Sequence, residues 1–153
     1  MSDASVGKIR AIAIKTAESG PMREVEEAVA EVDGGLVGGV KPSPDRGITF
    51  LATAHWRQVM GELNANLPWH TRRANVLIEA ESLAHLIGKL LRFGEVEVQV
   101  INETRPCGLM DQFLPGLKDA LKPDCRAGVY GRVICGGVFR IGDTATASDA
   151  TAG

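Results

Sequence analysis

Short apolar runs separated by glycine and proline dominate the pattern of this chain. Residues 8–15 (KIRAIAIK) are rich in isoleucine and predict a first strand, and residues 48–52 predict a second, short apolar strand. In residues 95–101 valines alternate with polar side chains, which indicates a strand with one buried face. The pattern therefore favours many short strands joined by tight turns.

Two hairpins are predicted from the same pattern. The first covers residues 90–100 and turns at Gly94. The second pairs a strand over residues 129–134 with a partner over residues 138–141, with glycines at the turn between them. Antiparallel neighbours of this kind are typical of all-β architectures.

Helices are predicted to be few and brief. Residues 54–63 place apolar side chains on one face and follow Thr53, a good N-cap. Shorter helices are expected over residues 83–87 and 115–121. Residues 22–32 fit a helix or a strand, and periodicity does not decide between the two.

These elements predict a mainly β protein, built as a small β-barrel or sandwich with a few short helices. Alternating βαβ units are absent, which argues against a Rossmann-type parallel sheet. A chain of 153 residues suggests a single domain, here residues 1–143. Residues 144–153 contain Ala, Thr, Ser and Asp without an apolar pattern, and we expect a disordered tail.

Composition narrows the functional classes. The formal net charge is −2, so no overall basic field favours nucleic acid or an anionic membrane as a partner. No apolar run approaches the roughly 20 residues that span a bilayer, and the N-terminus does not resemble a signal peptide. The three cysteines are few and form no C-x-x-C pair, which fits a reducing cytoplasm and no structural zinc.

The segment 103–111 (ETRPCGLMD) concentrates the most chemistry. It places a cation, a rigid proline, a thiol and a glycine in consecutive positions, Arg105 to Gly108. A neighbouring cation favours the thiolate of Cys107, and the flanking Pro and Gly would fix how the backbone presents it. The alternative interpretation is a buried free cysteine that packs as a small hydrophobe.

Two further segments could recognise an anion. The loop 34–47 is rich in glycine and carries Lys41 and Arg46, so its backbone N–H groups could cradle a phosphate. The alternative is a mobile surface loop. Arginine and asparagine side chains stand before the predicted strand 76–78, and these are Arg72, Arg73 and Asn75.

Three segments together resemble the MOSC family, named after the C-terminal domain of molybdenum-cofactor sulfurase. Residues 71–78 (TRRANVLI) resemble its R-x-N-[IV] strand start. Residues 104–110 (TRPCGLM) resemble the segment around its characteristic cysteine, and residues 128–133 (GVYGRV) resemble its closing hairpin. The resemblance runs from about residue 8 to residue 143. It implies a distorted small β-barrel.

One departure from the family pattern lies in the glycine loop. The family usually carries G-L-x-G-D-R, whereas this chain reads Gly35-Leu36-Val37-Gly38-Gly39 with no Asp after Gly38. Asp45-Arg46 follows a few residues later.

The resemblance implies molybdenum cofactor as the ligand. Cys107 would be the catalytic residue and the molybdenum ligand, since thiolate is a suitably soft donor. Arg73 and Asn75 match family positions that help to hold the pterin and its phosphate. Weaker matches for the same anionic group are Arg72, Arg105 and Arg132.

Three functions follow as hypotheses. The first is a reductase of N-hydroxylated substrates, which would need an external electron-transfer protein because the chain carries no flavin or cluster motif. The second is a sulfur carrier with a persulfide on Cys107 and an external sulfur-donor protein. The third is a non-catalytic binding module with a degenerate ligand loop.

The remaining cysteines and histidines are predicted to have other roles. Cys125 and Cys135 are interpreted as structural, since Cys135 falls in the predicted closing hairpin. His55 and His85 lie on predicted helices, where we expect surface or interface side chains rather than catalysts.

Overall fold

The computed structural model describes residues 4–18 and 20–149 and shows a mainly β protein, as predicted. The strands are β1 (Ala4–Lys15), β2 (Met22–Val25), β3 (Glu27–Ala30), β4 (Ile48–Ala52), β5 (Val76–Ile78), β6 (Lys89–Phe93), β7 (Val96–Glu103), β8 (Val129–Cys135), β9 (Gly137–Arg140) and β10 (Thr144–Asp149). Most of them are short, and their turns contain glycines with positive φ angles.

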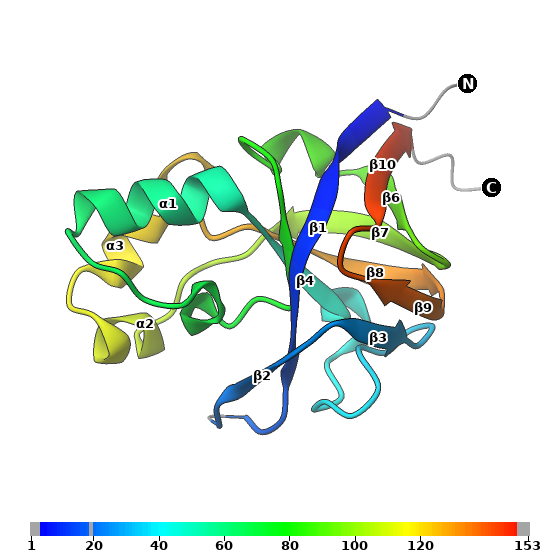
Figure 1. Cartoon of the computed structure of the whole chain (residues 1–153), viewed down its shortest axis with the longest axis horizontal. Helices are drawn as coiled ribbons and strands as arrows, with labels where there is room; N and C mark the ends of the chain where they lie inside the picture. Colours follow the sequence, from blue (N-terminus) through cyan, green and yellow to red (C-terminus); the bar gives the residue numbers. More distant parts are fainter. Residues whose placement is uncertain (1–3, 19, 150–153) are drawn as a thin grey trace.

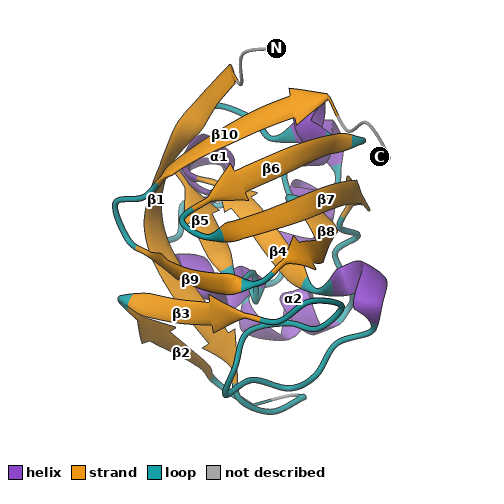
Figure 2. Ribbon diagram, turned by 90° about the vertical axis from the view of Figure 1, so that its right-hand side faces the viewer, coloured by secondary structure: helices purple, strands orange, loops and turns teal. Residues whose placement is uncertain are grey.

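Seven of these strands close into a barrel. The ring runs in the order β10-β6-β7-β8-β4-β5-β1, and it closes because β1 pairs antiparallel with β10. The strand β2 extends the sheet beyond β1. Figures 1 and 2 show β1 crossing the molecule, with the start of β1 beside the end of β10.

Apolar alternation places the core inside this barrel. Val96, Val98 and Val100 on β7 are buried, and the β6–β7 hairpin forms where it was predicted. Phe93 packs edge-to-face against both Phe50 and Phe139, with ring centroids 5.6 and 5.0 Å apart. Such T-shaped pairs stabilise a core beyond the area that they bury.

The structure settles the helix-or-strand choice at residues 22–32 and changes the partner of the strand predicted over residues 138–141. The stretch 22–32, which fitted a helix or a strand, contains the strands β2 and β3 and no helix. The sequence predicted a hairpin of β8 with β9, and this prediction is wrong. The strand β9 instead pairs antiparallel with β3 in a separate two-stranded sheet. The partner of β9 is therefore more than a hundred positions away, as the pair Ala30–Gly137 illustrates, and local sequence carries no signal for it.

The predicted disordered tail is wrong for residues 144–149. They form β10, which pairs with β6 on one side and with β1 on the other. Ala145 and Ala147 point into the core, and polar residues alternate with them. Residues 150–153 of the predicted tail lie outside the described residues.

The helices lie together outside one end of the barrel (Figure 1). They are α1 (Thr53–Glu62), α2 (Leu109–Phe113) and α3 (Leu117–Leu121). The 3-10 turns are η1 (Pro44–Arg46), η2 (Trp69–Arg72), η3 (Ala84–Leu86) and η4 (Pro123–Cys125), of which η1 contacts β8 and η3 contacts β6. Trp56 and Val59 of α1 pack with Leu117 and Leu121 of α3 in a second apolar cluster. This cluster supports the segment that carries Cys107, because Met110 of α2 belongs to it.

Polar groups at this second cluster differ from expectation. Thr53 does not cap α1; its hydroxyl bonds the backbone of Ala80 instead. His55, predicted at the surface, is buried. Arg126 is also buried, and its guanidinium donates to the Glu62 carboxylate at 2.8 Å and to the Ala120 carbonyl at 3.1 Å.

Candidate functional site

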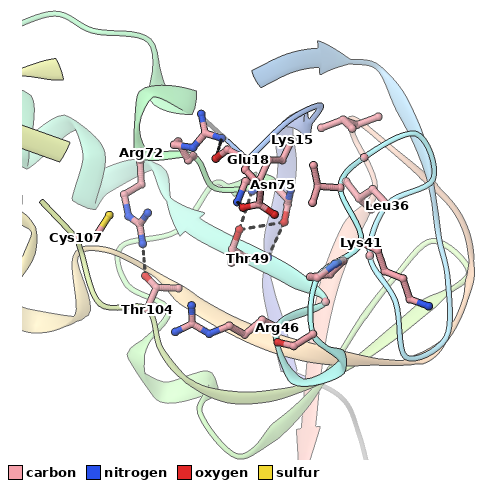
Figure 3. A pocket seen from close by; sticks show the side chains of 18 of the residues that line it. Lys15, Glu18, Leu36, Lys41, Arg46, Thr49, Arg72, Asn75, Thr104 and Cys107 are labelled. Atoms are coloured by element: carbon pink, nitrogen blue, oxygen red, sulfur yellow. Dashed lines mark hydrogen bonds and ion pairs between the residues drawn. The ribbon is translucent and has the colours of Figure 1, made fainter. Parts of the chain in front are cut away.

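A cavity of about 520 Å³ opens where β1, β4 and residues 72–75 meet the loop 35–47 and the segment 104–110. Figure 3 shows side chains from all of these segments converging on it. Its cationic lining residues are Lys15, Lys41, Arg46, Arg72, Arg73 and Arg105. Glu18 is the one carboxylate among the described residues that line it, and it pairs with Lys15 at 3.4 Å. Such a surplus of positive charge in a hollow attracts anions.

Arg72 is the buried cation of this cavity. Its Nε donates to the Ala127 carbonyl at 3.0 Å, and its Nη2 donates to the Thr104 hydroxyl. Within the described part of the chain no carboxylate pairs with it. Burial lowers the pKa of Arg72 to about 10, so the side chain remains charged at neutral pH. An uncompensated buried charge is costly, and a bound anion would offset that cost.

Cys107 lies on the same wall as Arg72, between the end of β7 and the start of α2. Figure 3 shows its sulfur beside the Arg72 side chain. The thiol is exposed, so the alternative interpretation of Cys107 as a core residue is wrong. Gly108 has an ordinary helical φ of −59°, and a Cβ there would meet nothing, so presentation of the thiol does not require glycine.

Arg73 and Asn75 line the cavity, but most of their polar atoms hold its wall together. The Arg73 guanidinium donates to the backbone carbonyls of Ala17, Glu18 and Gly20, which fixes the turn after β1. Asn75 accepts from the backbone and hydroxyl of Thr49 on β4, and donates to the Ala13 carbonyl on β1 at 3.2 Å. These contacts join the strands that form the floor of the cavity.

The glycine loop folds back on itself to form the opposite wall. A Cβ on Gly47 would collide with the carbonyl oxygen of Gly34, so the two ends of the loop meet only because glycine stands there. Lys41 and Arg46, the cations noted in the sequence, both line the cavity. The Arg46 guanidinium lies 4.7 Å from the centre of the Tyr130 ring.

Arg132 is not brought to this cavity. Its guanidinium pairs with Asp33 at 2.7 Å and with Asp45 at 3.4 Å, and two carboxylates already satisfy it. The same contact removes Asp45 from the cavity, so Asp45-Arg46 contributes its cation but not its carboxylate. The other predicted site residues, Cys107, Arg72, Arg73, Asn75 and Arg105, all line one cavity.

Sequence reasoning missed three residues of this site. Lys15 ends the first strand, Thr49 lies within an apolar one, and Thr104 stands three residues before Cys107 in the cysteine segment. The polar interruption of apolar strands at Lys15 and Thr49 is the signal that could have indicated them. Nothing local distinguishes Thr104 from any other buried threonine.

The donor set of the site suits an anionic ligand with a thiophilic metal rather than a metal ion alone. Among the described residues no three His, Cys, Asp or Glu side chains come close enough to hold a metal by themselves. A single thiolate can complete the coordination of a soft metal whose other ligands belong to a cofactor. No helix in the described residues is long and apolar enough to cross a membrane.

The chain belongs to the MOSC domain family, because the model of that family, the MOSC domain, matches residues 37–146. The match covers most of the glycine loop, the cysteine segment and most of the barrel. The family resemblance inferred from the sequence is thereby confirmed.

Known structures show the same fold. The chain is similar to the YuaD protein from Bacillus subtilis, with a TM-score of 0.79, 15% identity, and coverage of 98% of this chain and 100% of that chain. It is also similar to YiiM from Escherichia coli, with a TM-score of 0.73, 16% identity, and coverage of 94% of this chain and 71% of that chain. A third similar structure is YiiM from Geobacillus stearothermophilus, with a TM-score of 0.70, 19% identity, and coverage of 96% of this chain and 73% of that chain. No curated protein sequence matches the chain.

Proposed function

We propose that the cavity binds molybdenum cofactor and that the protein reduces N-hydroxylated substrates with it. The observation that carries this proposal is the juxtaposition of an exposed thiol, Cys107, with a buried guanidinium, Arg72, that no carboxylate of the described residues neutralises. The first would ligate the metal, and the second would bind the phosphate or another anionic group of the pterin.

The residues present fit this group. Cationic side chains stand on both walls, Lys41 and Arg46 on the loop and Arg72 and Arg105 on the opposite side. When bound, the cofactor supplies the oxygen-atom and electron chemistry. The protein would hold the ligand through Cys107 and its cations, and it would leave the mouth of the cavity open for substrate. An electron-transfer protein outside this chain would provide the electrons.

A sulfur-carrier function is the second candidate, and the exposure of Cys107 favours it. A persulfide on this thiol would stand beside Arg72 and Arg105, whose positive charge stabilises a sulfur anion. This function needs a sulfur-donor protein and no molybdenum.

The test compares metal and pterin content in protein purified from a host that makes molybdenum cofactor. The wild type is measured beside Cys107→Ser and the matched control Cys135→Ser, which alters an exposed thiol outside the cavity. We expect near-stoichiometric molybdenum and pterin in the wild type and the control, and loss of molybdenum in Cys107→Ser. Absence of molybdenum from all three proteins would rule out the reductase and direct attention to persulfide on Cys107.

A further inference from the structure

Thr104 forms a closed triangle of hydrogen bonds with Arg72. Its hydroxyl accepts from the Arg72 Nη2 and donates to the Ala127 carbonyl at 2.6 Å. The same carbonyl accepts from the Arg72 Nε at 3.0 Å. Thr104 and Arg72 are both buried, so each of these bonds is made away from bulk solvent, where its geometry is well defined.

The partners in this triangle are all neutral. A carboxylate in place of the hydroxyl would hold the guanidinium more strongly, but it would also cancel its charge. A hydroxyl and a carbonyl fix the direction of the guanidinium and leave its positive charge available to the cavity. These hydrogen bonds offset part of the cost of burying the guanidinium, but they leave its net charge without a counter-charge.

Thr104 also ties this cation to the thiol segment. Its backbone N–H donates to the Gly128 carbonyl at 2.9 Å, and Cys107 follows three residues later on the same stretch. Thr104 therefore links the Arg72 guanidinium directly to the segment that presents Cys107. Figure 3 shows the Arg72 guanidinium pointing at the Thr104 hydroxyl, with a dashed line for their hydrogen bond.

We propose that Thr104 is a positioning residue, whose hydroxyl orients Arg72 to bind the anionic group of the ligand beside Cys107. The identity of that ligand rests on the proposed function, but the anion binding itself does not. A phosphate-bearing molecule is the ligand class that a fixed guanidinium in a cationic cavity would take.

The experiment uses inorganic pyrophosphate as the probe and the full chain purified from a host that makes no molybdenum cofactor. Titration calorimetry gives its affinity for wild type, Thr104→Val, Thr104→Ser and Thr104→Ala. Valine matches threonine in shape and lacks only the hydroxyl, and serine keeps the hydroxyl. Glu62→Gln serves as a control that weakens an ion pair away from the cavity.

We expect Thr104→Val and Thr104→Ala to bind pyrophosphate about tenfold more weakly, the loss typical of one hydrogen bond to a charged group. Thr104→Ser should restore the affinity, and Glu62→Gln should leave it unchanged even if its thermal stability falls. The pattern of rescue separates positioning from a general loss of stability.

Three results would overturn the proposal: no binding of pyrophosphate by the wild type, equal affinity in Thr104→Val, or equal loss in Thr104→Ser. If Thr104→Val does not fold, the pyrophosphate affinity of Thr104→Ala is compared with those of the wild type and Thr104→Ser instead. The molybdenum assay is separate. Pyrophosphate binding that depends on Thr104 in a protein that never acquires molybdenum would retain the positioning role and reject the reductase.

Discussion

Two buried arginines of this protein stand in opposite electrostatic environments. Arg126 lies among the helices and pairs with the Glu62 carboxylate at 2.8 Å, so its charge is compensated within the fold. Arg72 is equally buried, 8% exposed like Arg126, but its partners are a hydroxyl and a carbonyl. One arginine completes a packed region, and the other borders a cavity.

The difference shows how a binding residue can be recognised without its ligand. A fold usually compensates a buried charge internally, because an isolated charge costs several kcal/mol in a poorly polar surrounding. Where neutral groups hold a buried cation next to a hollow, an external anion can supply the missing compensation. Arg72 meets this description and Arg126 does not, although both are buried to the same degree.

Replacement of Arg72 by methionine should break the comparison most strongly. We expect pyrophosphate affinity to fall about a hundredfold, as loss of a bidentate charged contact predicts. Stability should hold or rise, because burial lowers the folded pKa of Arg72 to about 10, below its ordinary value, and its charge therefore opposes folding at neutral pH. Calorimetry and urea unfolding measure the two effects; a large loss of stability would contradict the interpretation.

Replacement of Glu62 by glutamine should give the reverse result at the other arginine. Arg126 would lose its charged partner while remaining buried, and Glu62 is about half exposed (45%), which moderates the cost. We expect a loss of about 1 kcal/mol in the free energy of unfolding. Pyrophosphate affinity should not change. A variant that binds the anion less well would show that the two regions are coupled.

The cysteines sharpen the same contrast between an open and a packed region. Cys107 and Cys135 are exposed, whereas burial raises the pKa of Cys125 to about 11. Iodoacetamide at neutral pH should therefore modify Cys107 and Cys135 in the native protein and reach Cys125 only after unfolding. Mass spectrometry of peptides identifies the sites. Fast native labelling of Cys125 would mean that the helical region opens readily.

The exposure of Cys135 also corrects its expected structural role.

The smallest effect is expected at His55, beside Arg126. Burial, followed by the nearby Arg126 cation, lowers the pKa of His55 below its usual 6.5. The unfolded chain therefore takes up the proton first as pH falls through 6.5, so this group lowers stability below that pH and costs nothing above it. His55→Gln should lose less stability than the wild type between pH 7 and pH 5, by urea unfolding. Parallel curves for the two proteins would contradict this.

Much of the barrel was predictable because large aliphatic side chains alternate along its strands. The β6–β7 hairpin and β8 follow directly from that pattern. The strand β10 escaped prediction because its inward residues, Ala145 and Ala147, are too small to register as an apolar face. The pairing of β9 with β3 depends on closure of the whole barrel and not on either segment alone.

The site was predictable where chemistry and sequence proximity coincide. Cys107 and Arg105 are two positions apart in the sequence, and both line the cavity. The prediction that Arg132 lines the site is not supported, because its guanidinium pairs with Asp33, a residue distant in sequence on the turn after β3. Thr104 could not be recognised, since its role depends on Arg72, which approaches from another part of the chain.

The pairing of β1 with β10 has a consequence for synthesis of the protein. Among the strands of the barrel β1 is synthesised first and β10 last, so the edges of β1 and β6 stay uncovered until β10 has been made. During that interval the growing chain exposes open strand edges, which invite pairing with other chains. Contacts of such high sequence separation also slow folding. Premature termination before Thr144 would leave β1 and β6 without the strand that joins them, and such fragments should aggregate rather than accumulate as smaller barrels.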